Sequence, residues 1–145
     1  MSRVGGLPLF QDALKDVERL MILGYGLDIM DMKRLDEKKL ERLSEKVLSE
    51  NEKRYFDTLT VLKRKKEFFS GRFCAREAFY KATGRGVRDF ELSSIEIVKD
   101  ELGKPRLIVS EEQLLFYFKR KCSVHLSLSH DGDYTIAGVI VESLG

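Results

Sequence analysis

The sequence predicts an α+β fold in which an antiparallel β-sheet packs with a long central helix. A long segment, residues 67–83, carries apolar side chains at helical spacing on two flanks, so we expect it to be buried on more than one side. Four short segments in the second half of the chain have the composition of strands, and tight turns join them in pairs, which is typical of antiparallel sheets. An apolar segment at residues 21–30 provides one more strand.

Length and composition favour one compact domain with a short extension. The chain has 145 residues, of which 43% are hydrophobic, enough to bury a core. In residues 1–20, Gly5, Gly6 and Pro8 interrupt regular structure before apolar residues recur at helical spacing. We expect a short amphipathic helix in this atypical or non-native N-terminal extension, and we assign the functional domain to residues 21–145.

Charge and cysteine usage exclude several classes of protein. The chain has 26 basic and 24 acidic residues, and a net charge of +2 is too small for a protein that binds nucleic acid through bulk charge. No window approaches the roughly 18 to 20 apolar residues needed to span a bilayer, and the N-terminus lacks the pattern of a secretory signal. Cys74 and Cys122 lie far apart in apolar stretches and form no CxxC pair, which favours a reducing compartment. We therefore expect a cytoplasmic protein with neither a nucleic acid nor a membrane as partner.

The first half of the domain is expected to contain one strand followed by helices. Residues 21–30 are β-branched, aromatic and glycine-containing, which fits a buried strand with close backbone neighbours. Residues 34–48 follow helical spacing and have basic faces. Ser49 and Glu52 have the spacing of a capping box, which predicts that a new helix starts there. The basic run at residues 63–66 is either a solvated connector or a helix start.

The second half begins with the long helix at residues 67–83, which ends at Gly84-Arg85-Gly86 because glycine can adopt the left-handed conformation that closes a helix. The strands expected after it are residues 92–99, 104–110, 122–129 and 134–141. A turn at Gly103-Lys104-Pro105 joins the first pair, and a turn at Asp131-Gly132 joins the second.

Three charged residues stand out as candidates for chemistry. Asp28 lies in the middle of the apolar strand, where a carboxylate is costly unless a cation compensates it. Glu77 and Lys81 lie one helical turn apart, so both can project toward one place. The plainer alternatives are a strand-end carboxylate with a basic partner and a surface ion pair, and the residues alone favour neither interpretation.

Together these residues suggest phosphate chemistry. Asp28 and Glu77 could hold a magnesium ion, which binds one or two carboxylates and leaves other positions for water and phosphate oxygens. Positive charges that could surround a polyphosphate are Arg64, Lys66, Arg72, Lys81 and Arg85. The chain has no GxxxxGK[ST] loop, no GxGxxG fingerprint and no cysteine and histidine cluster with zinc spacing.

The predicted strand at residues 122–129 alternates between apolar and polar side chains. Its polar face carries Ser123, His125, Ser127 and Ser129. This face could line a site, although an ordinary solvent-facing side of an antiparallel sheet is the commoner explanation. Alternation of serine and histidine on one strand does not make a catalytic triad, which also needs an orienting carboxylate.

Four segments resemble the holo-acyl-carrier-protein synthase family of phosphopantetheinyl transferases, over residues 21 to about 141. They are ILGYGLDI at residues 22–29, LSENE at 48–52, FFSGRFCAREAFYKA at 68–82 and HLSLSH at 125–130. The resemblance implies the 4'-phosphopantetheinyl transferase-like fold, a homotrimer with sites between subunits, and a role in fatty acid biosynthesis. It also implies a magnesium-dependent enzyme that moves the 4'-phosphopantetheine group from coenzyme A to a serine of apo-acyl carrier protein and releases adenosine 3',5'-bisphosphate.

The resemblance assigns roles to individual residues. The catalytic residues would be Asp28, Glu77 and Lys81, with Asp28 and Glu77 as the magnesium ligands and Lys81 contacting the coenzyme A phosphates. The other residues expected to contact coenzyme A are Arg64, Arg72, Gly84, Arg85, Gly86 and His125, and those expected to contact the carrier protein are Arg34, Lys38 and Arg42. Glu77 or a metal-bound water would take the serine proton, and the sequence does not decide between them.

Three residues depart from the family pattern. Tyr25 replaces a small aliphatic residue, Arg76 replaces the lysine before the glutamate, and Arg85 stands where threonine is common. Two other readings of the chain stay open at this stage. One is a non-catalytic basic binding protein, and the other is a degenerate trimeric family member that does not transfer the group.

Overall fold

The computed structural model describes residues 21–144, so the helix predicted within residues 1–20 lies outside the described residues, and the division at residue 20 stays a prediction. The predicted α+β class is confirmed. The strands are β1 (Ile22–Asp31), β2 (Glu96–Lys99), β3 (Pro105–Ile108), β4 (Cys122–Asp131) and β5 (Tyr134–Ser143). The helices are η1 (Met32–Arg34), α2 (Glu37–Val47), α3 (Glu50–Thr58), α4 (Leu62–Ala82), η2 (Leu92–Ser94) and α5 (Glu111–Phe118).

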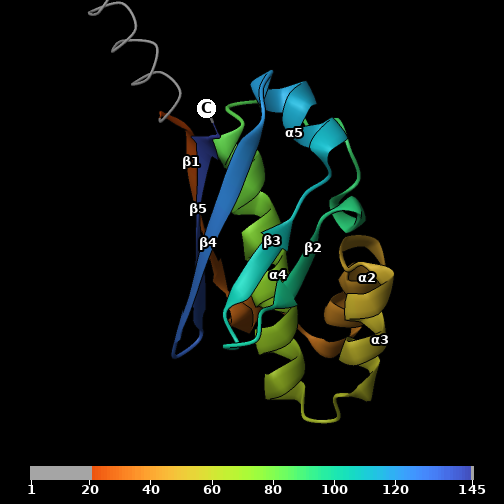
Figure 1. Ribbon diagram of the computed structural model, residues 1–145. Helices are drawn as coiled ribbons and strands as arrows, with labels where there is room; N and C mark the ends of the chain where they lie inside the picture. The colour runs from red at the N-terminus through yellow and green to blue at the C-terminus, as the bar shows by residue number, and fades with distance from the viewer. Residues whose placement is uncertain (1–20, 145) are drawn as a thin grey trace, which may run out of the picture.

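The main sheet has the order β1-β5-β4, with both pairs antiparallel, and β2 and β3 form a separate antiparallel hairpin. Figure 1 shows α4 running along this sheet, with α2 and α3 on its other side and α5 near one end. The two predicted hairpin turns are confirmed, since Gly103 and Gly132 have φ values of 80° and 57°, which other residues rarely adopt. The fold thus places the long helix at its centre.

Glycine in β1 allows α4 to pack unusually close to the sheet. A Cβ atom at Gly24 would overlap the carbonyl oxygen of Ala82, and one at Gly26 would overlap that of Ala78. This confirms the close backbone neighbours predicted from the glycines of residues 21–30. Buried side chains surround α4 on most of its circumference, so the helix is the core of the molecule.

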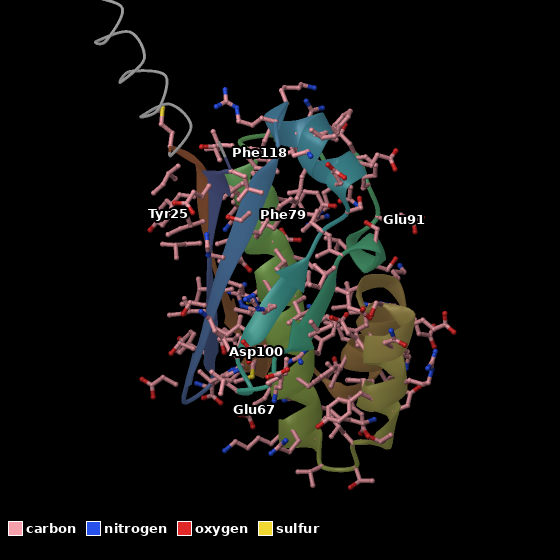
Figure 2. The ribbon with its side chains drawn as sticks, viewed as in Figure 1. Tyr25, Glu67, Phe79, Glu91, Asp100 and Phe118 are labelled. Atoms are coloured by element: carbon pink, nitrogen blue, oxygen red, sulfur yellow. The ribbon has the colours of Figure 1, made fainter. Side chains whose placement is uncertain are left out.

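The expectation that residues 21–30 form a fully buried strand is wrong for one of its two faces. The inner face of β1 packs on α4, but Tyr25, Leu27 and Ile29 are 62%, 50% and 60% exposed. They lie opposite Ile140, Gly138 and Ile136 of β5, so the sheet has an apolar outer face. Figure 2 shows Tyr25 pointing away from α4 on this face, which we call the outer apolar face.

The helices before α4 begin at side-chain caps. Asp36 accepts a hydrogen bond from the Lys39 N–H, so α2 begins at Glu37, three residues later than predicted. The capping box is confirmed, because Ser49 and Glu52 each accept a hydrogen bond from the other's backbone N–H. The basic run at residues 63–66 proves to be the first turn of α4, which settles the choice left open by the sequence.

Two segments differ from the prediction. Residues 92–94 form the short helix η2 instead of strand, so β2 starts only at Glu96. The helix α5 was not predicted, and its N-cap Ser110 had been assigned to the end of a strand. The Ser110 hydroxyl accepts a hydrogen bond from the Gln113 N–H, which stabilises the first turn of a segment rich in aromatic residues. No helix of the described residues is long and apolar enough to cross a lipid bilayer.

Candidate active site

Asp28 and Glu77 line one cavity of about 360 Å³ between β1, α2 and α4, which we call the carboxylate cavity. Arg34 and Arg88 line the same cavity. Asp28 reaches this cavity because it lies two residues after Gly26, on the same inner face of β1, and therefore points toward α4. Residues that are 49 positions apart in the sequence are thus brought to one place by the packing of α4 on β1.

Asp28 and Glu77 each have a basic partner. The Lys81 ammonium lies 2.9 Å from Oδ1 of Asp28, and the Arg88 guanidinium contacts Oε1 of Glu77. Lys81 thereby provides the cation that the buried position of Asp28 demands, since the Asp28 side chain is only 14% exposed. Lys81 itself is 54% exposed, so its partner can change when a ligand enters.

The two carboxylates fit a magnesium ion. Asp28 and Glu77 share the cavity, and two carboxylates are enough for an ion that keeps water or phosphate oxygens in its other positions. Within residues 21–144, no group of three or more histidine, cysteine or acidic side chains is placed to hold a metal.

Cys74 is buried on α4 close to Asp28. Burial raises the pKa of its thiol well above the usual value, and the nearby carboxylates of Asp28 and Glu77 raise it further. The thiol also donates a hydrogen bond to the Thr135 carbonyl oxygen at 3.7 Å. Cys74 therefore stays protonated and acts as a packing residue.

Arg64 and Arg72 line a different and larger cavity, of about 540 Å³, which we call the arginine cavity. The Arg72 guanidinium lies 4.0 Å from the centre of the Phe68 ring, and its buried Nε has no hydrogen-bond partner. Burial lowers the pKa of this guanidinium, while Glu52 opposes the shift. Arg72 is half-buried and has a donor available to an anionic ligand, while the carboxylates of Glu52, Glu67 and Glu96 line the same cavity.

The two histidines lie on opposite faces of β4, and only His130 lines the arginine cavity. The alternation predicted for this strand is confirmed, because Leu126 is buried while His125 and Ser127 are exposed. In His125 the single nitrogen Nε2 contacts both Ser123 at 3.2 Å and Glu142 at 3.3 Å. A triad needs its serine and carboxylate on different ring nitrogens, so this cluster is not one. The assignment of His125 to coenzyme A stays a prediction, since His125 lies outside both cavities of this chain.

Comparison with known proteins decides the family. Residues 24–139 match the profile of a family described as the 4'-phosphopantetheinyl transferase superfamily. The chain belongs to this superfamily.

Similar members of the superfamily match over almost their whole length. The chain is 41% identical to a holo-[acyl-carrier-protein] synthase of Geobacillus sp. (strain WCH70), with 86% of this chain and 99% of the relative covered. It is 39% identical to that of Bacillus subtilis (strain 168), with 86% and 98% covered. A Bacillus anthracis holo-(acyl-carrier-protein) synthase solved in complex with CoA (3',5'-ADP) has a TM-score of 0.72 and 40% identity, with 85% and 98% covered.

Within this superfamily, the departure at Arg76 has a structural explanation. Arg76 is fully buried, and its guanidinium contacts the Glu52 carboxylate and the carbonyl oxygens of Leu92, Ile95 and Arg72. Glu52 in turn accepts from the Ile97 N–H at 2.8 Å. Arg76 therefore joins α4 to α3, η2 and β2, and it lies away from the cavity that contains Glu77.

The other two departures lie at the edges of the molecule. Tyr25 belongs to the outer apolar face, so it does not disturb the packing of β1 on α4. Arg85 makes two hydrogen bonds to Asp89, at 2.7 and 3.0 Å, and lies 5.4 Å from the centre of the Phe116 ring. Gly84 has a φ of 73° and ends α4 as expected, while a side chain at Gly86 would meet open space. The coenzyme A contacts predicted for residues 84–86 stay predictions.

The residues predicted to contact the carrier protein lie near the carboxylate cavity. Arg34 lines this cavity, and Lys38 and Arg42 are exposed on α2. Sequence analysis missed Arg88, which contacts Glu77 from the segment after α4, and His130. The alternation of β4 could have separated His130 from His125, but only the position of α4 shows which face of the strand is covered.

Proposed function

We propose that this chain transfers the 4'-phosphopantetheine group of coenzyme A to a serine of an apo-acyl carrier protein. The observation that carries the proposal is that Asp28 and Glu77 line one cavity and that Lys81 pairs with Asp28, in a chain whose relatives are named for this activity. Free, buried Cys74 and Cys122 are compatible with the cytoplasm as its location.

The reaction is a displacement at phosphorus. The serine oxygen attacks the β-phosphorus of coenzyme A, the bond from that phosphorus to the oxygen of the nucleotide phosphate breaks, and adenosine 3',5'-bisphosphate leaves. Magnesium held by Asp28 and Glu77 would supply positive charge to the pyrophosphate. In this proposal Lys81, next to Asp28, stabilises the negative charge that develops on the leaving phosphate, and Glu77 or a water molecule takes the serine proton.

The separation of the two cavities supports a site that is shared between subunits. Asp28 and Glu77 line one cavity, whereas Arg64 and Arg72 line the other, although a single coenzyme A molecule is expected to contact all four. The outer apolar face gives a second copy of the chain a surface on which to pack. We propose a homotrimer in which the arginine cavity of one subunit completes the carboxylate cavity of its neighbour, with His125 on the outer face near the boundary.

The basic face of α2 provides the docking surface for the carrier protein. Lys38 and Arg42 are exposed there, and Arg34 leads from this face into the carboxylate cavity. Acyl carrier proteins are small and acidic, so this charge favours encounter and orients the serine toward the cavity.

Labelling of an apo-acyl carrier protein by coenzyme A, with and without magnesium, tests the proposed reaction. The proposal expects magnesium-dependent formation of the holo carrier protein. A non-catalytic basic binding protein would bind the carrier protein without labelling it. A degenerate trimer would assemble without labelling, and either result would refute the proposed activity.

Subunit mixing tests the shared site separately from the reaction. Asp28→Ala and His125→Ala proteins are dissociated, mixed and reassociated, so that some sites combine an intact Asp28 with an intact His125. Recovery of activity that neither parent has supports the shared site. An active monomer at assay concentration, or no recovery after demonstrated subunit exchange, contradicts the trimer but leaves the transferase proposal in place.

A further inference from the structure

A buried chain of hydroxyl groups connects α4 to the histidine of the arginine cavity. The Ser70 and Thr135 hydroxyls lie 2.7 Å apart, and the Thr135 hydroxyl lies 2.8 Å from Nδ1 of His130. Ser70 and Thr135 are fully buried, whereas His130 is exposed and lines the cavity. Two buried hydroxyls in an apolar core are costly unless they are hydrogen-bonded, so their joint orientation toward His130 needs an explanation.

Counting protons gives the direction of each hydrogen bond in this chain. A hydroxyl has one proton, and Ser70 donates its proton to the Glu67 carbonyl oxygen at 3.2 Å. Ser70 must then accept from Thr135, which uses the only proton of Thr135. The contact between Thr135 and His130 therefore requires that Nδ1 of the ring carries a proton and donates it.

The opposite direction makes fewer hydrogen bonds. If Thr135 donated to Nδ1, Ser70 would donate to Thr135 and the bond from Ser70 to Glu67 would be lost. The first arrangement makes all three hydrogen bonds. The opposite arrangement leaves one of these buried hydrogen bonds unmade, which is unfavourable. The neutral ring thus keeps its proton on Nδ1 and has a lone pair on Nε2, and Nε2 becomes a donor for an anion when the ring is protonated.

We propose that Thr135 and Ser70 are positioning residues that fix the tautomer and orientation of His130 toward an anionic group in the arginine cavity. Thr135 is the direct cross-strand neighbour of His130, so the sheet holds the two groups at a fixed separation. The Thr135 oxygen continues to accept from Nδ1–H when the ring is protonated, so the same network also supports the imidazolium. The ring edge at Nε2 and Cε1 lies over Gly71, beside Phe68 and Arg72.

The occupant that this arrangement suits is the phosphate of a nucleotide. Arg64, Arg72 and Lys99 line the same cavity, and Phe68 and Tyr55 provide aromatic surface. The ligand part of the inference rests on the proposed function, in which coenzyme A brings such a phosphate. The tautomer part does not rest on it, because it follows from contacts within the chain.

Nitrogen NMR of the histidine rings tests the tautomer without any ligand. The chain has two histidines, so His125→Ala leaves one ring and assigns the signals of His130. At a pH where the ring is neutral, the unaltered network predicts the Nδ1–H form. Ser70→Ala removes the acceptor for the Thr135 proton, so Thr135 should donate to Nδ1 and the ring should change to the Nε2–H form.

The variants separate this network from a general packing role. Thr135→Ser keeps the hydroxyl and should retain the Nδ1–H form of the ring. Thr135→Val keeps the shape of the side chain but removes the hydroxyl, so the ring should lose its preference for the Nδ1–H form. Thr58→Val, which removes an exposed hydroxyl from α3, is the matched control and should leave the ring signals unchanged. An Nε2–H ring in the unaltered protein, or a Ser70→Ala ring that keeps the Nδ1–H form, overturns the proposed direction.

Coenzyme A binding measured by calorimetry tests the ligand part. Thr135→Val should weaken binding about tenfold, as expected for a hydrogen bond that supports a charged group, and Thr135→Ser should restore it. In the transfer assay the KM for coenzyme A should rise while kcat changes little. Unchanged affinity in Thr135→Val overturns the positioning role. If the unaltered protein does not bind coenzyme A at all, the proposed function fails. The NMR measurement of the tautomer still tests the proposed direction of the hydrogen bonds among Ser70, Thr135 and His130.

Discussion

Arg76 and Glu77 are consecutive residues of α4 with different surroundings. Arg76 is fully buried, and Glu52 together with three backbone carbonyl groups occupies its guanidinium. Glu77 lines an open cavity, where its carboxylate contacts one partly exposed side chain, Arg88. A charge whose donors are all used by buried partners cannot exchange them, whereas a charge paired with a partly exposed side chain can.

This difference separates structural charge from functional charge on one helix. Arg76 donates to the carbonyl oxygens of Leu92 and Ile95 and pairs with Glu52, so its loss would leave a buried carboxylate without its cation and buried carbonyl oxygens without these donors. Glu77 and Asp28 have partners that a ligand can displace. We therefore expect changes at residue 76 to act on stability and changes at residue 77 to act on catalysis.

The largest expected effect is the loss of transfer in Asp28→Ala and Glu77→Ala. Each removes one of two carboxylates proposed to hold magnesium, so turnover should fall about a thousandfold or more. Far-ultraviolet circular dichroism and urea unfolding should show an intact fold. Glu112→Ala, which removes an exposed carboxylate from α5, is the matched control. Near-normal turnover by both variants at saturating coenzyme A would refute the metal assignment.

The next effect concerns stability at Arg76. Arg76→Met should lower the free energy of unfolding by about 3–5 kcal/mol, because the buried Glu52 carboxylate loses its cationic partner. Arg76→Lys should lose less, since it keeps the charge but cannot reach all the carbonyl groups. Urea unfolding measures both, and transfer activity per folded molecule should stay near normal. Equal stability of Arg76→Met and the unaltered protein would contradict the structural role.

A smaller effect is expected on the surface of α2. Charge reversal in Arg42→Glu should raise the KM for the carrier protein about tenfold at low salt and leave the KM for coenzyme A nearly unchanged. Arg34→Glu should do the same and also reduce turnover, because Arg34 lines the carboxylate cavity. In both variants the increase in the KM for the carrier protein should become smaller as added salt screens the charges. A carrier-protein KM that stays constant at low ionic strength would locate docking elsewhere.

The smallest effect is expected at Arg85. Its partner Asp89 and the Phe116 ring hold the guanidinium at the surface, so Arg85→Thr should change the free energy of unfolding by less than about 1 kcal/mol. Because Asp89 already binds the guanidinium, the KM for coenzyme A should rise only a few fold. A loss of affinity of a hundredfold would show that Arg85 leaves Asp89 and binds a phosphate directly.

Local patterns predicted the parts of the fold that local chemistry controls. The capping box at Ser49, the turns at Gly103 and Gly132, and the strand alternation around Leu126 depend on neighbours in the sequence, and all are present. The helix α5 was missed because a short apolar segment fits a strand or a helix equally well. Its N-cap Ser110 was the available signal.

The candidate site was predictable where it lies on regular elements. Asp28, Glu77 and Lys81 have fixed directions on a strand and a helix, so their convergence follows once α4 packs on β1. Arg88 lies in the irregular segment after α4, where no periodicity gives its direction. Arg76 could not be separated from Glu77 by its sequence, because the partners that bury it come from residues 52 and 92–95.

The contact between the glycines of β1 and the backbone of α4 fixes the separation of the two carboxylates proposed for catalysis, Asp28 and Glu77. Gly24 and Gly26 bring the strand against Ala82 and Ala78, one turn or less from Glu77 and Lys81. The repulsion between Asp28 and Glu77 is therefore overcome by the folding of the core, before any ligand arrives. The site is preorganised, and a side chain at Gly26 would widen the spacing of the carboxylates as well as weaken the core.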